Sequence, residues 1–284
     1  MAGRKDVFLI NLILVIYLAI MSVCHAQSTG RDVSPSRKLP RVSTPTARVS
    51  PFKPMVYPWK KNITATVFWI GEKPTVNNPT PNNASSWDTE WQRNYGGYDN
   101  PDKAARIQYR PKAFKPQLNP FYVALPYNDL IDHRRHKPEA SRVIPWWPRR
   151  LDKRPGKTAC KGRWLQIVYG NKVCYAQWED CGPFNTTDWR YVFGNARPKN
   201  VKNNQAGIDI SPAVRDYLGI RSHSKVHWRF VDFSHVPRGP WAYYGRNNPF
   251  VDPKLDPDRK AREEYMIYLR KLRDEAYRER NNRR

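Results

Sequence analysis

The segment Tyr175–Phe184, YAQWEDCGPF, holds the residues best suited to chemistry. Glu179 and Asp180 are adjacent carboxylates, and Gly182-Pro183 turns the chain away soon after them. A carboxylate at a strand end beside aromatic rings is partly desolvated, and desolvation favours its protonated form. Such a group can act as a general acid near neutral pH.

The elements before this segment decide which carboxylate reaches a site. Gly170-Asn171 is a two-residue hairpin signal with glycine first, which predicts two paired strands. Alternation along this hairpin gives one core face, formed by Leu165, Ile167, Cys174, Ala176 and Trp178. Asp180 then lies at the mouth end of the core face, opposite Lys161, whereas Glu179 points to the opposite face as surface charge. Burial would raise the pKa of Asp180 and Lys161 would lower it.

The same register sorts the cysteines. Cys160 faces Cys181 at the open end of the hairpin, close enough for a cross-strand disulfide. An oxidising compartment would preserve that bond. Cys174 is expected to be a buried free thiol. The alternatives are a bulge that shifts the register, or reduction of all three cysteines.

A second acidic residue lies in the segment Gly207–Ile220, GIDISPAVRDYLGI. We expect a short strand that carries Asp209, followed by a helix. Ser211 is suited to cap that helix, Pro212 to begin it and Gly219 to end it.

Tryptophan rings can stack on the apolar faces of sugars, and the chain has 11 of them. Those within strand patterns are expected in the core: Trp69, Trp164 and Trp228. Those in loop insertions can contact a ligand: Trp87, Trp91, Trp146 and Trp147. Trp178 fits either role.

No long helical period precedes residue 211, so the body is predicted to be mainly β. Besides the hairpin, we expect strands in Ile63–Glu72, in Asn119–Asp129 and in Lys225–Trp241. Two long insertions, 73–118 and 130–159, separate these elements.

The N-terminal end has the composition of a targeting segment. Residues 1–26 combine a short basic start, an apolar run over 7–23 and a small residue at Ala26, as a cleaved secretory signal does. An uncleaved anchor over 7–23 or a lipoprotein site at Cys24 are the alternatives. Residues 27–57 are rich in Pro, Ser, Thr and Arg, which predicts a disordered basic tether.

The C-terminal end differs, because residues 246–284 carry apolar side chains at helical spacing among basic ones, which predicts a basic amphipathic helix. The formal net charge of the 284 residues is +25, which favours anionic partners. Export makes nucleic acid the least expected of them, and neither a Gly-rich phosphate loop nor zinc-finger spacing occurs.

The motifs EDCGPF and GIDISPAVRDYLGI together resemble the Asp-x-Gly-Pro-Phe and Ile-Asp-x-Ser motifs of the rare lipoprotein A family. TATVFWIGE and FYVALPYND are similar to the opening strand and the Leu-Pro segment of that family. The resemblance spans residues 63–235. It implies a six-stranded double-psi β-barrel over 58–245, the fold shared with expansins and the lytic transglycosylase A group.

The resemblance also implies roles for the two aspartates. Asp180 corresponds to the acid that cleaves the glycan strands of peptidoglycan, and Asp209 to the residue that organises the groove. The family's histidine has no counterpart in this sequence, since Leu125 or Pro126 falls near its place.

These observations predict an exported protein, periplasmic or extracellular, that engages a cell-wall glycan. Asp180, Asp209 and Tyr122 are expected to line the groove, with further sugar contacts from Trp178, Asp129, Trp146 and Trp147. As a lytic transglycosylase the chain needs only Asp180, because the sugar's own hydroxyl attacks. Hydrolysis needs a second carboxylate, for which the candidates are Asp209, Asp129 and Glu72.

The alternative function is a non-catalytic, expansin-like wall-binding or structural protein whose basic surface supplies the affinity. In either case the expected partner is peptidoglycan or another anionic wall polymer, with membrane contact only through the N-terminal segment. No cofactor is expected. His133 and His136 lack further metal ligands in the sequence around them, so no metal site is predicted.

Overall fold

The computed structural model describes residues 55–75, 78–148, 156–256 and 259–282. The predicted signal or anchor of residues 1–26 lies outside this part of the chain, as does the predicted tether up to residue 54. Among the described residues, no helix combines the length and the apolarity that crossing a membrane requires.

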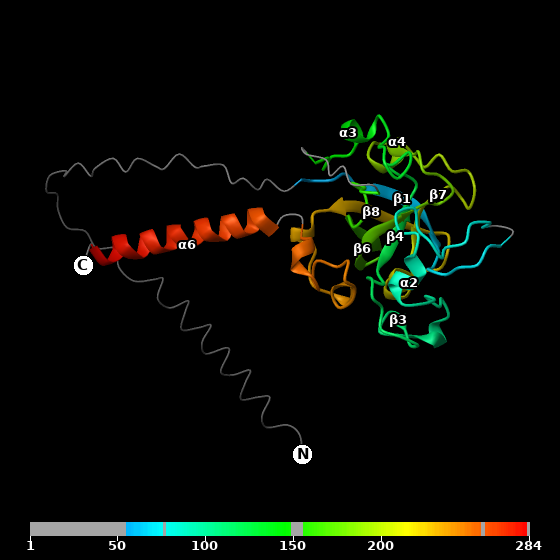
Figure 1. Cartoon of the computed structure of the whole chain (residues 1–284), viewed down its shortest axis with the longest axis horizontal. Helices are drawn as coiled ribbons and strands as arrows, with labels where there is room; N and C mark the ends of the chain where they lie inside the picture. The colour runs from blue at the N-terminus through cyan, green and yellow to red at the C-terminus, as the bar shows by residue number, and fades with distance from the viewer. Residues whose placement is uncertain (1–54, 76–77, 149–155, 257–258, 283–284) are drawn as a thin grey trace, which may run out of the picture. The chain divides into compact units, whose positions relative to one another are not determined.

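Six strands of the described chain close into a barrel in the order β1-β7-β4-β6-β5-β8 (Figure 1). Their bounds are β1 (Lys60–Val67), β4 (Tyr122–Leu125), β5 (Trp164–Tyr169), β6 (Lys172–Cys181), β7 (Ala206–Ile210) and β8 (Ser224–Val231). The predicted mainly-β class and the six-stranded barrel are therefore confirmed.

The barrel contains two parallel pairs. Strand β1 runs parallel to β7, and β4 runs parallel to β6, while β4 and β7 are antiparallel neighbours. Parallel neighbours need long connections, and here each connection includes other strands: β4, β5 and β6 lie between β1 and β7, and β5 lies between β4 and β6. Strand β4 thus lies between the strand that carries Asp180 and the strand that carries Asp209.

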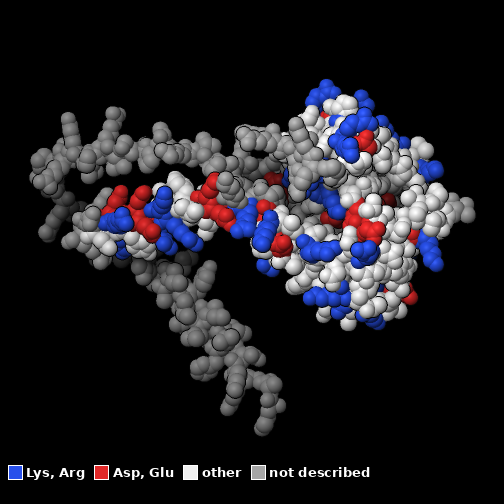
Figure 2. Space-filling model, in the orientation of Figure 1, with Lys and Arg blue, Asp and Glu red and all other residues white. Residues whose placement is uncertain are grey.

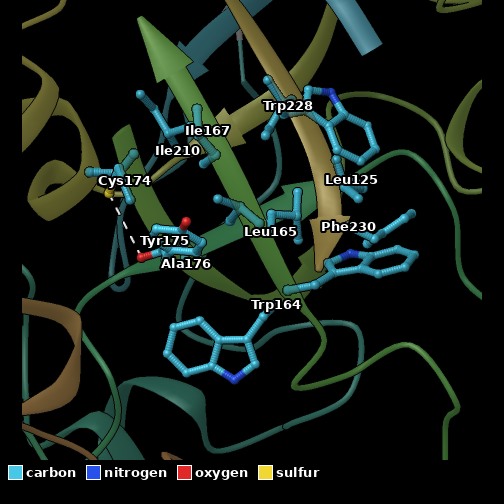
Figure 3. Close-up of a cluster of buried hydrophobic side chains, with 14 of the residues drawn as sticks. Leu125, Trp164, Leu165, Ile167, Cys174, Tyr175, Ala176, Ile210, Trp228 and Phe230 are labelled. Atoms are coloured by element: carbon cyan, nitrogen blue, oxygen red, sulfur yellow. Dashed lines mark hydrogen bonds between the residues drawn. The ribbon is translucent and has the colours of Figure 1, made fainter. Parts of the chain in front are cut away.

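The β5–β6 hairpin has the predicted register, with Leu165 opposite Ala176 and Ile167 opposite Cys174. Gly170 begins the turn at a φ of +57°, which glycine adopts without steric cost. Side chains from these strands, from β4, β7 and β8 meet inside the barrel, as Figure 3 shows for Leu125, Leu165, Ile167, Ile210 and Trp228.

A second cluster of buried side chains packs on the other face of β4. Tyr122 and Ala124 belong to it, whereas their neighbours Val123 and Leu125 belong to the barrel interior. The insertion 73–118 supplies most of the remaining packing through α2 (Trp91–Tyr95). Alternation along β4 therefore gives the strand an inner and an outer buried face.

A buried ion pair holds this insertion together. Nη1 of Arg106 donates to Oδ1 of Asp99 at 2.5 Å, and the Tyr122 hydroxyl donates to Oδ2 at 2.7 Å. Asp99 has no exposed surface, so it depends on these partners for its charge. Around it lie η2 (Lys103–Ala105) and the short pair β2 (Arg106–Ile107) and β3 (Arg110–Pro111).

The helix after β7 has the predicted caps. Helix α5 (Pro212–Leu218) begins with the proline, and Oγ of Ser211 accepts from the backbone N–H of Val214 at 3.3 Å. Gly219 ends it in the left-handed conformation at a φ of +71°. The other short helices of the body are α3 (Ala140–Val143), α4 (Trp189–Val192), η3 (Phe233–His235), η4 (Pro240–Ala242) and η5 (Pro253–Leu255).

The body extends beyond its predicted limits of 58 and 245. The Tyr57 ring is buried and contacts the Phe230 ring, with centroids 6.0 Å apart. At the other end, Asn248 is fully buried and the Phe250 ring packs on Phe233 at 4.7 Å. A C-terminal helix is present as α6 (Arg259–Asn282), but residues 246–256 of the predicted range 246–284 belong to the body instead. Each side chain of α6 that the structure describes is exposed.

The tryptophans divide differently from the sequence prediction. Trp164 and Trp228 are buried, as expected for strand residues, whereas Trp69 is only half-buried. Trp91, expected in an exposed insertion, is 1% exposed and contacts the Tyr122 ring. That prediction is wrong because the insertion forms its own packed cluster on β4. Figure 2 shows Lys and Arg side chains scattered over the visible face of the barrel.

Candidate functional site

Asp180 and Asp209 lie on the two strands that flank β4. Ala124 of β4 pairs with Asp180 of β6 on one side and with Asp209 of β7 on the other. Residues paired across neighbouring strands share a face of the sheet. The two carboxylates predicted to be catalytic are therefore brought to one region, on the outer face of β4.

A bulge in β6 produces this placement. Val123 pairs with Trp178, but the next residue of β4, Ala124, pairs with Asp180, so Glu179 is an extra residue in the ladder. The predicted register holds up to Trp178 and fails at the bulge. The prediction that Asp180 lies on the core face is therefore wrong. Its side chain is on the outer face, with Ala124.

The Asp180 carboxyl is held by backbone groups. Its Oδ1 accepts from the N–H of Ser86 and from the N–H of Cys181, each at 2.7 Å. The indole of Trp178 donates to the backbone carbonyl of Asp180 at 2.8 Å. The side chain is 8% exposed, and its burial raises the pKa of Asp180 to about 6, against the lowering effect of the hydrogen bonds and of Lys161.

Asp209 is half-buried and accepts a hydrogen bond from the Thr66 hydroxyl. Desolvation raises the pKa of Asp209 to about 7, the Thr66 bond opposes the shift, and the nearby charges of Asp180 and Glu72 add to it. Burial also raises the pKa of Glu72, whose Oε2 accepts from Nδ2 of Asn82 at 2.8 Å. Asp180 and Asp209 can thus retain protons close to neutral pH.

The Gly-Pro turn shapes the space beside Asp209. A Cβ atom on Gly182 would lie 3.2 Å from Oδ2 of Asp209, so a larger residue would press on the carboxylate. Two residues later, the Phe184 ring is 46% exposed, with the Lys202 ammonium 5.5 Å from its centroid. This exposed ring, two residues beyond Gly182 in the chain, is a surface on which a sugar could stack.

Two predicted sugar contacts are buried. Tyr122 is 1% exposed, and its hydroxyl binds Asp99 and accepts from the N–H of Ile70 at 3.0 Å. Trp178 has no exposed surface and packs against the Trp87 ring, with centroids 5.6 Å apart. The prediction that these two residues line the groove is wrong, since both belong to packed clusters.

Asp129 is also buried, and it anchors the insertion 130–159. Its carboxylate accepts from the Thr158 hydroxyl and from the N–H of Ala159 at 2.8 Å, and Nε2 of His136 lies 3.4 Å away. These partners come from the insertion, and the residue has no exposed surface, so the predicted substrate contact is wrong and the role of Asp129 is structural. Among the described residues, no group of three or more His, Cys, Asp or Glu side chains is arranged to hold a metal.

Trp146 and Trp147 are half-buried rather than free. The Trp146 indole donates to the carbonyl of Ala159 at 2.7 Å, and the ring lines a cavity beside β5 and β6. The Trp147 ring packs edge-on against His136 at 5.2 Å. Of the predicted aromatic contacts, Trp146 is the one that faces an open space.

The predicted disulfide is wrong, since Cys160, Cys174 and Cys181 are free thiols. The β5–β6 ladder ends at the pair Trp164 and Gln177, so Cys160 lies outside it. Cys174 is buried, as predicted.

The chain turns sharply just before β5. Gly162 has a φ of +81°, and its N–H donates to the carbonyl of Trp178 at 2.8 Å. Beyond the bulge, Cys181 pairs with Leu125 of β4 instead of with the β5 side. The two cysteines therefore do not meet as a cross-strand pair.

Glu179 is the largest departure from the sequence prediction. It is 2% exposed rather than a surface charge, and it lines the cavity that Trp146 also borders. Ser86 and Thr66, which bind the acid pair, and Phe184 were likewise not predicted as site residues. In the sequence, only the adjacency of Glu179 and Asp180 pointed to this region. The residues that bind the acids come from distant segments of the chain, so no local pattern could identify them.

Comparison with known proteins gives no match, whether the chain is compared with protein-family models, with curated proteins or with solved structures. The resemblance to the rare lipoprotein A family therefore stays a prediction that depends on the quoted motifs.

Proposed function

We propose that this chain is an exported protein of the rare lipoprotein A type that engages a cell-wall glycan at Asp180 and Asp209. The observation that carries the proposal is the acid pair on either side of Ala124, with pKa values raised to about 6 and about 7. Burial also raises the pKa of Asp99 in its structural pair with Arg106, so the raised values support the proposal only together with the placement of the two acids on one face.

The barrel is proposed to have the double-psi topology. Two features of the barrel support this topology. Strands β1 and β7 form one parallel pair and β4 and β6 another, and the two pairs meet where β4 and β7 run antiparallel. The motif Asp180 to Phe184 ends one of these strands, and Asp209 lies in another. Both motifs thus fall at corresponding places of the two parallel pairs.

The two acids can divide the work of glycan cleavage. Asp209 is the more exposed and keeps its proton at a higher pH, so it is suited to protonate the leaving glycosidic oxygen. Asp180 ionises first and can accept the proton of the attacking sugar hydroxyl. One proton is given and one is taken, and the product is an anhydro-sugar. This division moves the acid from Asp180, where the sequence placed it, to Asp209.

Binding without cleavage is the second candidate, and the cover over Asp180 favours it. With 8% of its side chain exposed beneath Ser86, Asp180 contacts a sugar hydroxyl only if the segment Ser85–Asp88 moves. In that case the exposed Phe184 ring and the net charge of +25 would supply the affinity. The apolar spacing of Tyr265, Leu269 and Leu272 in the basic helix α6 would add an amphipathic contact surface.

Digestion of purified cell-wall sacculi separates the two candidates. The full chain is expected to release anhydro-sugar products detectable by mass spectrometry. Asp209→Asn and Asp180→Asn should each abolish them, while the exposed α6 variant Asp274→Asn should not. Binding that persists in both site variants, weakens steeply with salt and yields no products would establish the non-catalytic function instead.

A further inference from the structure

A cavity of about 440 Å³ lies on the side of β6 away from β4. Its walls come from β5, β6, β8 and the segment 156–163, and residues near Asn247 close one end. Asp180 and Asp209 do not border it. Its volume is in the range of small-molecule binding sites.

Three residues place buried polar atoms at this cavity, and these atoms make no hydrogen bond of normal geometry within the described residues. They are both carboxylate oxygens of Glu179, Nε1 of Trp164 and Nδ2 of Asn247. Glu179 and Trp164 are each 2% exposed. The Asn247 amide lies near enough to the Glu179 carboxyl to act on its pKa, but the indole N–H of Trp164 and the carboxylate oxygens still lack well-formed hydrogen bonds. Buried polar atoms in folded proteins are almost always paired, so these atoms point to a missing partner in the cavity.

The charges around the cavity are incompletely balanced. Nζ of Lys161 lies 3.9 Å from Glu179 and also 3.9 Å from Asp88, too far for a direct hydrogen bond to either. Burial raises the pKa of Glu179 to about 7, against the lowering effects of the Lys161 charge and of the Asn247 amide. Lys157 and Arg163 also border the cavity, so Glu179 is the one acidic side chain in a lining with three basic ones. A ligand with hydroxyl groups could donate to Glu179, whereas a carboxylate placed against it would be repelled.

The walls complete the chemical description. Trp146 and Phe233 provide apolar surface, and the indole of Trp164 and the amide of Asn247 provide N–H donors. A neutral sugar matches this combination, since it has apolar C–H faces, hydroxyl donors for Glu179 and oxygen acceptors for the two N–H groups.

We propose that the cavity bordered by Glu179, Trp164 and Asn247 is a binding site for a neutral sugar, separate from the acid pair. Ligand binding at the cavity stands on its volume and on the buried polar atoms without a well-formed hydrogen bond. The choice of a sugar among neutral polyhydroxylated ligands rests on the proposed function. Because Glu179 and Asp180 belong to the same strand, a glycan held in the cavity would be anchored close to the acids.

Isothermal titration calorimetry of the full chain tests the proposal with two soluble probes, the trimer of N-acetylglucosamine and the trimer of glucose. At least one is expected to bind saturably. Glu179→Gln should weaken that binding roughly tenfold or more, as expected for a lost hydrogen bond to a charged group. Glu90→Gln is the matched control, because Glu90 is 56% exposed in a surface pair with Arg93.

A structural role for Glu179 predicts a different pattern. If the carboxylate served only the fold, Glu179→Gln would lower the melting temperature and leave sugar affinity unchanged, which would overturn the proposal. The proposed site predicts an unliganded variant at least as stable as the parent, because it loses an unpaired buried carboxylate.

Titration followed by ¹H–¹⁵N NMR gives a second measurement that does not depend on the Glu179 variant. The indole N–H signal of Trp164, assigned with Trp164→Phe, should shift with the added trimer. Both measurements extend to about 10 mM of either trimer, a concentration at which even weak sites fill. If neither a saturable heat nor a shift of this signal is seen, water alone occupies the cavity and the proposal is wrong. Asp209→Asn should retain trimer binding while losing cleavage, so failure of one proposal is distinguishable from failure of the other.

Discussion

The backbone N–H of Ser86 donates to Oδ1 of Asp180 at 2.7 Å, although the two residues are 94 positions apart in the chain. This bond ties the insertion 73–118 to the strand end that carries the acid. Access to Asp180 is therefore controlled by a segment outside the barrel, and the site is a product of both.

Asp180→Asn is expected to fold normally and to lose glycan cleavage by roughly 10²- to 10⁴-fold. The asparagine oxygen can still accept from Ser86 and Cys181, so the melting temperature should change little. Circular dichroism and product release from sacculi measure the two effects. Unchanged cleavage by a folded Asp180→Asn would remove this residue from the mechanism.

Thr66→Val should raise the pKa of Asp209 further. The Thr66 hydroxyl donates to the carboxylate and so stabilises its ionised form, and valine keeps the shape without the donor. The titration of the Asp209 carboxyl carbon by ¹³C NMR measures the shift directly. A pKa that stays the same or falls would show that the hydrogen bond does not act on the ionised state.

The raised pKa values make stability depend on pH. Glu179, Asp180 and Asp209 bind protons more tightly in the fold than in the unfolded chain, so their stabilising contribution is complete below about pH 4. It is lost as the pH rises through about 6 to 7. Urea unfolding should therefore give a lower free energy of unfolding at pH 8 than at pH 5.

Glu179 accounts for roughly 2–3 kcal/mol of that difference, because its pKa rises from 4.5 to about 7. Glu179→Gln should flatten the pH dependence by this amount, and the exposed Glu90→Gln should leave it unchanged. A dependence that is equally steep in both variants would contradict the assignment to Glu179.

The cysteines of the body should be unreactive thiols in the native protein. Burial raises the pKa of Cys160, Cys174 and Cys181, which suppresses the reactive thiolate. Peptide mass mapping after alkylation should find these three residues modified only when denaturant is present. A peptide pair linked through Cys160 and Cys181 would instead restore the disulfide.

Tyr122→Phe should destabilise the fold by roughly 1–3 kcal/mol without weakening sugar binding. The hydroxyl is a partner of the buried Asp99 carboxylate and does not reach the acid pair. Denaturant unfolding and trimer titration measure the two properties. Weakened binding at unchanged stability would show that the Tyr122 hydroxyl contacts the sugar after all.

Local signals were enough to predict the hairpin and helix α5. Gly170-Asn171 set the register of Leu165 and Ile167 correctly, because a two-residue turn leaves one pairing. Ser211, Pro212 and Gly219 marked the ends of α5 for the same reason, since caps act within a few residues.

Features that depend on distant segments could not be predicted. The bulge at Glu179 arises where β6 leaves the hairpin and pairs with β4, which no local pattern indicates. The burial of Tyr122 follows from the insertion that packs over it, and composition alone suggested an open loop. The predicted disulfide failed because it continued the hairpin ladder past its last pair.

The extra residue in β6 has a consequence for how the two sites are related. Without residue 179 the ladder would run on unbroken, with Trp178 on Val123 and the following aspartate on Ala124. Such a shortened chain would keep its acid pair and forfeit only the cavity carboxylate. The proposed cavity site and the proposed acid site would thus depend on different residues of one strand, so deleting residue 179 should affect the first and spare the second.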